Sequence, residues 1–388
     1  MQRIVLARAA ALLGGPAVAL SLTTGAASAQ VATPTGWRTV ATISNQPTNG
    51  TALVSVAAGN PSHAWAVGIT APNSGTGITA PVVEAWDGST WSPVTLPAGV
   101  LSTLGTNVLL DTASAGGPKD VWAFDLSGHW LRFDGATWTA GKFPGSVLPE
   151  SSLTIGTSAV WAFGTAAGRT GLAPYAAYHT STGWKRTPVP GHGGIVDASA
   201  VTRRDLWAVI GAGGLFSGIG ATRSGSLLHW YAGHWHAVAT LPSKLRNASL
   251  SSVLARGDKN VWVGGALKNS KRGTTEAVGH WNGHHWTVTT LRAAASVAKW
   301  RLIKMVTDGS GGIWALGICG SHCGASGPVT RLWHEVAGTW SRPVEPKLAT
   351  SRTALLGLAP TGKSVWAVGD EQAGTSANGL IAVWGPTP

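Results

Sequence analysis

The chain has 388 residues, among them 53 glycines, 21 tryptophans and two cysteines, and its formal net charge is +12. The length suffices for two average domains or one large repeat array, and so few cysteines exclude a small fold held together by several disulfides. Residues 30–150 carry 4 Lys/Arg and 7 Asp/Glu, whereas residues 151–388 carry 22 and 9. A polyanion is therefore a candidate partner for the second part; the other interpretation is that the basic charge only keeps an exported protein soluble.

The first 29 residues are typical of a secretory signal peptide. Arg3 and Arg8 form a basic segment, residues 9–22 are apolar, and Ala27-Ser28-Ala29 is a small-x-small cleavage signal. The apolar run is too short to span a bilayer, and no later stretch approaches about 20 uninterrupted apolar residues. We therefore expect a secreted, extracellular protein with a mature chain over 30–388 and no transmembrane helix.

A motif of the form WAVG recurs seven times after the signal peptide. It begins as HAWAVG at 63–68 and ends as SVWAVG at 364–369, and the six intervals between its tryptophans average about 50 residues. That period fits a propeller blade of four strands. Short Val/Ala/Trp/Leu runs cut by Gly, Pro and Asn favour strands and turns over helices. The seven tryptophans are Trp65, Trp122, Trp161, Trp207, Trp262, Trp314 and Trp366.

A second motif, a short hairpin, follows six of the seven WAVG runs. In WDGSTWSPVTLP at 86–97 the Asp-Gly pair supplies residues that tolerate the positive φ of a tight turn. The seventh hairpin is split between LIAVWG at 380–385 and GWRTVATI at 36–43. Such a split closes a ring and removes two free sheet edges. The sequence thus predicts an all-β fold, a seven-bladed β-propeller with four-stranded blades, whose last blade consists of 350–386 plus 36–43.

The remaining predicted blades are 51–97, 101–144, 150–190, 193–242, 247–291 and 297–346. Seven tryptophans lie in second strands, seven open fourth strands and five lie in third strands, while Trp130 and Trp300 fall outside this scheme. We expect the repeated rings to fill the gaps between blades, with the Ala and Gly of WAVG admitting the next blade closely. Exposed rings that stack on sugars are the alternative.

The two motifs together resemble a known group of repeats. The alternation of (V/L)WAVG with (W/F)DGxTW resembles tryptophan-rich propeller repeats of secreted actinobacterial proteins. Residues 55–68 and 82–94 are also similar to the tectonin repeat, and the turns at Asp87 and Asp134 are similar to Asp-box turns of sialidase-like propellers. The tectonin resemblance implies binding of surface glycans.

Signatures of catalysis are missing from the sequence. There is no G-x-S-x-G elbow and no H-E-x-x-H pair, and none of the three tyrosines lies in a sialidase-type motif. A binding protein is therefore favoured over an enzyme, and we assign no catalytic residue and no cofactor. A divergent polysaccharide hydrolase or lyase stays open, and it requires two carboxylates or a Tyr/His pair that converge near the ring axis.

Histidines gather in the hairpins of blades 4 and 5. If Trp230 pairs with Trp235, His229 faces His236 across the strands, and His280 holds the corresponding place in the next blade. These three histidines are weak candidates for a metal site, but no carboxylate or Cys completes the set. An exposed edge that tolerates His is the favoured interpretation, and no metal site is assigned.

The two cysteines lie four residues apart, in CGSHC. In an exported protein Cys319 and Cys323 are expected to form a disulfide that closes a small loop. A Cys–His–Cys metal site or a redox pair is the alternative.

Basic residues are concentrated in the loops that join strands two and three and in those that join blades. These loops emerge on one face of a propeller, which should therefore be positive, mainly on blades 4 to 6. A solvated charged rim is the alternative. The candidate ligand-binding residues are Arg169, Arg223, Lys244, Arg246, Lys268, Lys271, Arg272, Arg292 and Lys347.

These observations predict a secreted, non-catalytic binding propeller. Its expected partner is a cell-surface or cell-wall glycan, neutral or anionic, which binds the basic face. An extracellular scaffold that binds a surface protein is the alternative, and it predicts an exposed apolar patch. Nucleic acid is not expected as a partner, and we expect a monomer.

Overall fold

The structure is a computed structural model. It describes residues 36–44, 49–72, 79–157, 159–168, 171–211, 225–269, 271–291, 297–319, 329–343, 353–373, 376–386 and 388. The predicted signal peptide, 1–29, lies outside the described residues. None of the described helices is long and apolar enough to cross a membrane.

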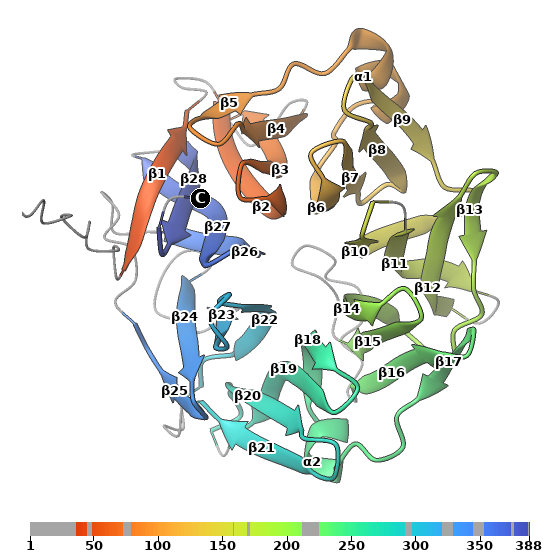
Figure 1. The fold of residues 1–388 in the computed structure, drawn as a ribbon, viewed down its shortest axis with the longest axis vertical. Coiled ribbons are helices and arrows are strands. Elements are labelled where there is room, and N and C mark those ends of the chain that lie inside the picture. Colours follow the sequence, from red (N-terminus) through yellow and green to blue (C-terminus); the bar gives the residue numbers. More distant parts are fainter. Residues whose placement is uncertain are drawn as a thin grey trace, which may run out of the picture. The chain divides into compact units, whose positions relative to one another are not determined.

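Seven four-stranded antiparallel sheets follow one another around a ring (Figure 1). This confirms the seven-bladed β-propeller. From the innermost strand outwards, the first four blades are β2 (Asn49–Asn60), β3 (His63–Pro72), β4 (Ala80–Trp86) and β5 (Trp91–Pro93); β6 (Leu110–Gly117), β7 (Asp120–Asp125), β8 (His129–Phe133) and β9 (Trp138–Lys142); β10 (Val147–Ile155), β11 (Ala159–Gly168), β12 (Gly171–Thr180) and β13 (Gly183–Arg186); β14 (Gly194–Thr202), β15 (Asp205–Gly211), β16 (Ser226–Tyr231) and β17 (His234–Ala237).

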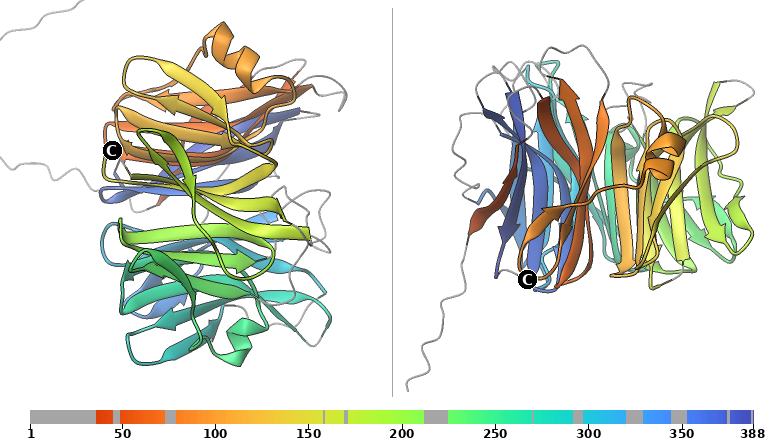
Figure 2. Two further views of the ribbon diagram at one scale, coloured as in Figure 1. Left: turned by 90° about the vertical axis from the view of Figure 1, so that its right-hand side faces the viewer. Right: turned by 90° about the horizontal axis from the view of Figure 1, so that it is seen from above.

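The last three blades repeat the pattern. They are β18 (Ser249–Gly257), β19 (Asn260–Lys268), β20 (Thr274–Trp281) and β21 (Trp286–Thr290); β22 (Trp300–Thr307), β23 (Ile313–Cys319), β24 (Val329–Val336) and β25 (Thr339–Ser341); β26 (Thr353–Thr361), β27 (Ser364–Ala373), β28 (Ser376–Trp384) and β1 (Trp37–Ile43). Two short helices, α1 (Ala98–Leu104) and α2 (Ser243–Arg246), connect blade 1 to blade 2 and blade 4 to blade 5. The strands of the blades run along the ring axis (Figure 2).

Blade 7 has the predicted composite structure. β1 pairs with β28 in an antiparallel register that sets Trp37 opposite Trp384 and Ile43 opposite Gly379. The outermost strand of the last blade therefore comes from the start of the described chain, and sheet hydrogen bonds close the ring.

Tryptophan pairs join each blade to the next. The ring of Trp122 in blade 2 lies 5.4 Å from that of Trp184 in blade 3, and Trp366 in blade 7 lies 5.1 Å from Trp91 in blade 1. In both pairs, the tryptophan of a second strand contacts the tryptophan that begins the fourth strand of the next blade. Trp122 and Trp366 are at most 1% exposed, so the repeated motif is a core contact between blades, as predicted.

The glycine of WAVG has a different role from the predicted one. Every innermost strand contains a β-bulge, and in blades 1 and 3 the glycine lies opposite it: Leu53 pairs with Gly68, and Pro149 with Gly164. A Cβ atom at Gly68 would lie 2.0 Å from the carbonyl oxygen of Ala52, and one at Gly164 would lie 2.0 Å from that of Leu148. At these positions the glycine admits the bulged strand of its own blade rather than the neighbouring blade.

The predicted Asp-Gly turns are held by their aspartates. Asp87 Oδ1 accepts the backbone N–H groups of Ser89 and Thr90 at 2.8 Å, and Asp134 Oδ1 accepts those of Ala136 and Thr137. The backbone hydrogen bond from Thr90 is the main reason why the pKa of Asp87 falls to about 2. These side chains shape the hairpins, which explains their spacing without a ligand.

Candidate functional site: a charged pocket on the ring axis

The β-bulges of the innermost strands select the side chains that surround the ring axis. Each bulge leaves one residue without a partner on the second strand, at the same level in every blade. A bulge re-aims its side chain. The seven bulged residues are Val54, Asp111, Glu150, Val196, Ser251, Ile303 and Leu356. All of them line one cavity of about 130 Å³, which we call the axial pocket.

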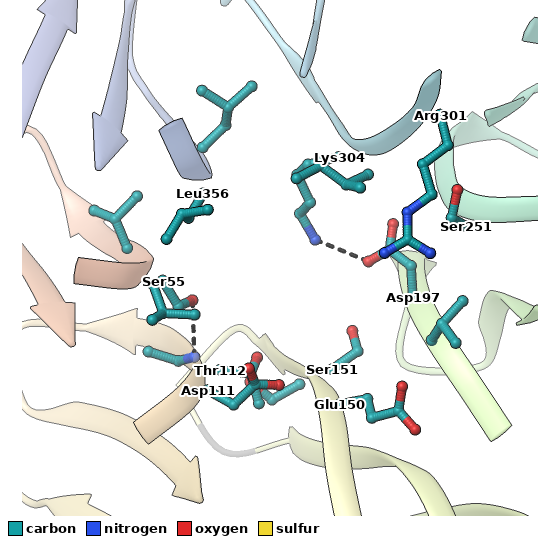
Figure 3. A pocket seen from close by; sticks show the side chains of 18 residues that line it. Ser55, Asp111, Thr112, Glu150, Ser151, Asp197, Ser251, Arg301, Lys304 and Leu356 are labelled. Carbon is teal, nitrogen blue, oxygen red and sulfur yellow. Dashed lines mark hydrogen bonds and ion pairs between the residues drawn. The ribbon is translucent and has the colours of Figure 1, made fainter. Parts of the chain in front are cut away.

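One wall of the axial pocket is acidic. Asp111 and Glu150, from adjacent blades 2 and 3, lie along the same side of it in Figure 3. Glu150 Oε1 accepts a hydrogen bond from Thr165 Oγ1 at 2.9 Å. Burial, and after it the charge of Glu150, raises the pKa of Asp111 to about 7. Near neutral pH this wall therefore gains or loses one proton readily.

The opposite wall is basic, and both of its cations come from β22. Lys304 Nζ contacts Asp197 Oδ1 at 2.8 Å, and Asp197 Oδ2 accepts hydrogen bonds from Ser252 Oγ and the Val253 N–H at 3.0 Å. Asp197 is 2% exposed, so this network is structural.

Arg301 is the cation that the network does not use. Its side chain lies above Asp197 in Figure 3, and within the described chain it makes no hydrogen bond or ion pair. Burial lowers the pKa of this guanidinium, which stays charged because its ordinary value is so high. An unpaired, recessed guanidinium is a ready binding group for a carboxylate.

The remaining wall is apolar. Val54, Ile303 and Leu356, which come from blades 1, 6 and 7, line it. The cavity is smaller than the roughly 300–1,000 Å³ of typical small-molecule sites. It fits a side chain or a chain end better than a run of sugars.

The two axial carboxylates meet one requirement of the hydrolase hypothesis. That alternative required two carboxylates near the ring axis, and Asp111 and Glu150 line the same axial pocket. A carboxyl group with a raised pKa beside a second carboxylate is also what a general acid needs. The narrow cavity argues against a polysaccharide substrate at this point, and we assign the pair to ligand binding.

The predicted basic candidates do not lie in this pocket. Lys244 and Arg246 are exposed on α2, and Lys268, Lys271 and Arg272 are exposed at or beside the end of β19. Arg169, Arg223, Arg292 and Lys347 lie outside the described residues. None of the described five lines the axial pocket, and their role in binding stays a prediction.

The histidine hairpins have the predicted register. His229 pairs with His236, and Trp230 with Trp235. A carboxylate lies beside one of them, since His229 Nε2 is 2.8 Å from Asp205 Oδ1. The His229 ring also stacks on Trp207 at 3.9 Å, which gives it a structural role. No group of three or more His, Cys, Asp or Glu side chains able to hold a metal is found among the described residues.

The structure describes only one of the two cysteines. Cys319 ends β23 and is 1% exposed, whereas Cys323 lies outside the described residues. The disulfide stays a prediction.

Sequence reasoning missed the axial residues, although a spacing rule points to them. In blades 1 to 6 the bulged residue precedes the WAVG tryptophan by 11 positions, as Asp111 precedes Trp122 and Glu150 precedes Trp161. In blade 7 the interval from Leu356 to Trp366 is 10. The interval is nearly constant because the inner two strands have nearly constant lengths.

Comparisons with known proteins place the chain by its fold. No protein-family model matches the sequence, and no curated protein matches it. A solved structure of YCF48 bound to D1 peptide is similar, with a TM-score of 0.55 and 16% identity over 90% of this chain and 96% of that one. YCF48 from Cyanidioschyzon merolae is similar as well, with a TM-score of 0.53 and 15% identity over 90% and 98% of the chains. At this identity the likeness establishes the propeller class alone.

Proposed function

We propose that this chain is an exported, non-catalytic propeller that binds a segment of a partner protein in its axial pocket. Arg301 takes a carboxylate of the segment, and Asp111 with Glu150 takes an ammonium or guanidinium group. The ligand is therefore a stretch of peptide that carries an acidic and a basic group within one or two residues. Export rests on the signal-peptide pattern of residues 1–29.

The unpaired guanidinium of Arg301 is the observation that carries this proposal. Burying a cation without a partner costs free energy, and a ligand carboxylate offsets that cost. The opposed acidic wall favours a ligand of mixed charge over a simple anion. The similar propeller YCF48, solved with a peptide bound, supports a peptide as the kind of ligand.

An apolar patch does not carry the protein-binding interpretation. The described large hydrophobic side chains that are exposed lie in different segments, among them Leu101 in α1, Leu172 in β12 and Val336 in β24. Recognition is argued instead from charges in a recessed site, which give specificity more than raw affinity.

A peptide array tests the proposal. Each hexapeptide contains one Lys and one Glu in a Gly/Ser background, and the array covers all combinations of their two positions. It is probed with the wild-type protein and with the variants Arg301→Gln and Asp111→Asn. Peptides with adjacent charges should bind best, and each variant should weaken that binding at least about tenfold, which is about 1.4 kcal/mol.

Two exposed residues supply matched controls. Lys259→Gln and Asp258→Asn remove charges of the same signs from the surface and should leave binding unchanged. Equal binding of uncharged hexapeptides, or variants that bind like the wild type, would refute the axial site. N-terminal sequencing of protein recovered from the culture medium tests export, which predicts a start near Gln30.

A glycan ligand is the second candidate. The exposed side chains of Lys268, Lys271 and Arg272 favour it, because they place three cations within five residues. Binding to an acidic cell-wall polymer that weakens at high salt and is lost on changing all three to Ser would support this function.

A further inference from the structure

In four blades a polar side chain caps the WAVG tryptophan at the hairpin end of the blade. In blade 2, Asp120 Oδ1 accepts the Nε1–H of Trp122 at 3.0 Å, and Arg132 lies over the same ring at 5.2 Å. In blade 5, Asn260 Oδ1 accepts the Nε1–H of Trp262 at 2.9 Å. In blades 4 and 6 a histidine stacks on the tryptophan and is held by Asp205 or Asp308.

Blade 3 lacks this cap. The residue two positions before Trp161 is Ala159, and the residue opposite Trp161 on the next strand is Tyr178 rather than Arg or His. Trp161 stacks on Phe163 as Trp122 stacks on Phe124, so the two indoles are oriented alike. Within the described residues, the Nε1–H of Trp161 has no hydrogen-bond acceptor. Blade 3 therefore offers a donor at the place where blade 2 carries a carboxylate.

A cleft lies beside Trp161, where blade 2 has the Asp120 side chain. It has a volume of about 500 Å³ between blades 3 and 4, and we call it the blade 3–4 cleft. Ala159, Trp161 and Tyr178 line it from blade 3, and Trp230 lines it from blade 4. The volume lies within the roughly 300–1,000 Å³ of small-molecule sites, unlike that of the axial pocket.

Cations surround the mouth of the cleft. Arg203 and Arg204, in the turn between β14 and β15, are exposed, line the cleft and make no ion pair among the described residues. Lys185 lies over the ring of Tyr178 at 5.9 Å. Among the residues that the structure describes, no Asp or Glu lines the cleft, and the nearby Asp205 is paired with His229. The charge of the site is thus complementary to an anion.

We propose that the blade 3–4 cleft binds a uronate unit of an acidic polysaccharide. The sugar carboxylate takes the place that Asp120 holds in blade 2, where it accepts the Nε1–H of Trp161 and pairs with Arg203 or Arg204. The apolar face of the sugar ring lies on Tyr178 and Trp230. This proposal does not depend on the axial pocket.

The lining favours a sugar over a peptide. A peptide that binds as an added strand gains its affinity from main-chain hydrogen bonds to a free strand edge. The cleft offers side chains and two turns, at Arg203-Arg204 and Ala232-Gly233, and no strand edge.

Calorimetric titration with trigalacturonate tests the proposal. Maltotriose serves as an uncharged sugar and triglutamate as an acidic peptide for comparison. We expect trigalacturonate to bind best. Ala159→Asp, which restores the carboxylate of blade 2, should weaken binding at least tenfold. The double variant R203Q/R204Q should do the same, and it stays informative if Ala159→Asp does not fold, because both arginines are exposed.

Matched controls separate the site from net charge. Lys119→Gln with Lys142→Gln removes two exposed cations from blade 2, and Ala98→Asp adds one carboxylate on α1. Both should bind trigalacturonate like the wild type. Triglutamate that binds as tightly as trigalacturonate, variants at 159 and 203–204 that leave binding unchanged, or no binding of trigalacturonate would each overturn the proposal.

Discussion

Blades 2 and 3 share the inner motif Val-Trp-Ala-Phe but treat its tryptophan in different ways. In blade 2, Asp120 and Arg132 close the space around Trp122. In blade 3, Ala159 and Tyr178 leave a cleft beside Trp161. Both tryptophans are at most 4% exposed and both wedge against the next blade, so the fold does not need the polar cap. The seven blades share what closes the ring, and in blade 3 the missing cap coincides with a cleft.

The sharpest contrast with the open gap between blades 3 and 4 is the sealed gap between blades 5 and 6. Glu276 of β20 is paired with Arg331 of β24, and the two side chains are 0% and 2% exposed. Arg331 also lies over the ring of Trp300 at 3.4 Å. Glu276→Ala removes the carboxylate that pairs with this buried guanidinium and should lower the free energy of unfolding by about 3–5 kcal/mol in urea titrations.

Asp258→Ala on the surface is the control for this variant and should change stability by less than about 0.5 kcal/mol. A loss below about 1 kcal/mol for Glu276→Ala would mean that the charges do not seal the gap.

Blades 3 and 2 also differ opposite the bulge of their innermost strand. Blade 3 has Gly164 there, and blade 2 has Asp125 at the equivalent position. Gly164→Ala places a Cβ 2.0 Å from the Leu148 carbonyl oxygen and should cost about 1–3 kcal/mol of unfolding free energy. Gly99→Ala in α1 is the control, since nothing lies within 4 Å of the added atom, and it should be neutral or stabilising. Equal stability of the two variants would contradict the bulge account of the WAVG glycine.

Much of this architecture was predictable from the sequence, because recurring motifs show directly how long each blade is and how many blades there are. The seven tryptophans, the split seventh hairpin and the pairing of Trp230 with Trp235 all follow from residues that recur. The axial pocket and the blade 3–4 cleft were missed for the opposite reason. Asp111, Arg301 and Ala159 matter because they differ from their counterparts, and a difference has meaning only once the bulge and the register are known.

Removing the polar cap of blade 2 should make the surroundings of its tryptophan resemble those in blade 3. Asp120→Ala leaves Trp122 Nε1 without its acceptor and should cost about 1–3 kcal/mol, because a buried donor then goes unsatisfied. Chemical denaturation measures this loss. Adding Arg132→Tyr should produce little further change, as in blade 3; a large second loss would show that the two blades differ by more than the cap.

The acidic wall of the axial pocket, shared by the same two blades, predicts a small pH effect. The pKa of Asp111 is raised to about 7 in the folded chain, so between about pH 4 and 7 the folded state binds more protons than the unfolded state. The free energy of unfolding should therefore fall as pH rises through this window and level off above it. Glu84 and Asp370, whose pKa values burial raises to about 7 and about 6, act in the same direction.

Asp111→Asn isolates the contribution of the axial wall. Its stability, followed by thermal unfolding at pH 5 and pH 8, should fall less between these two values than that of the wild type. A variant with the same pH dependence as the wild type would show that Asp111 is not desolvated.

The most direct test of the contrast between blades 2 and 3 is the indole N–H resonance of Trp161. Protein labelled with ¹⁵N-tryptophan is titrated with trigalacturonate, and the signal is assigned by its loss in Trp161→Phe. On titration this resonance should shift and the Trp122 resonance should not. In Ala159→Asp the Trp161 signal should already be displaced and should no longer respond. A Trp161 signal that stays fixed while the sugar binds would contradict the account.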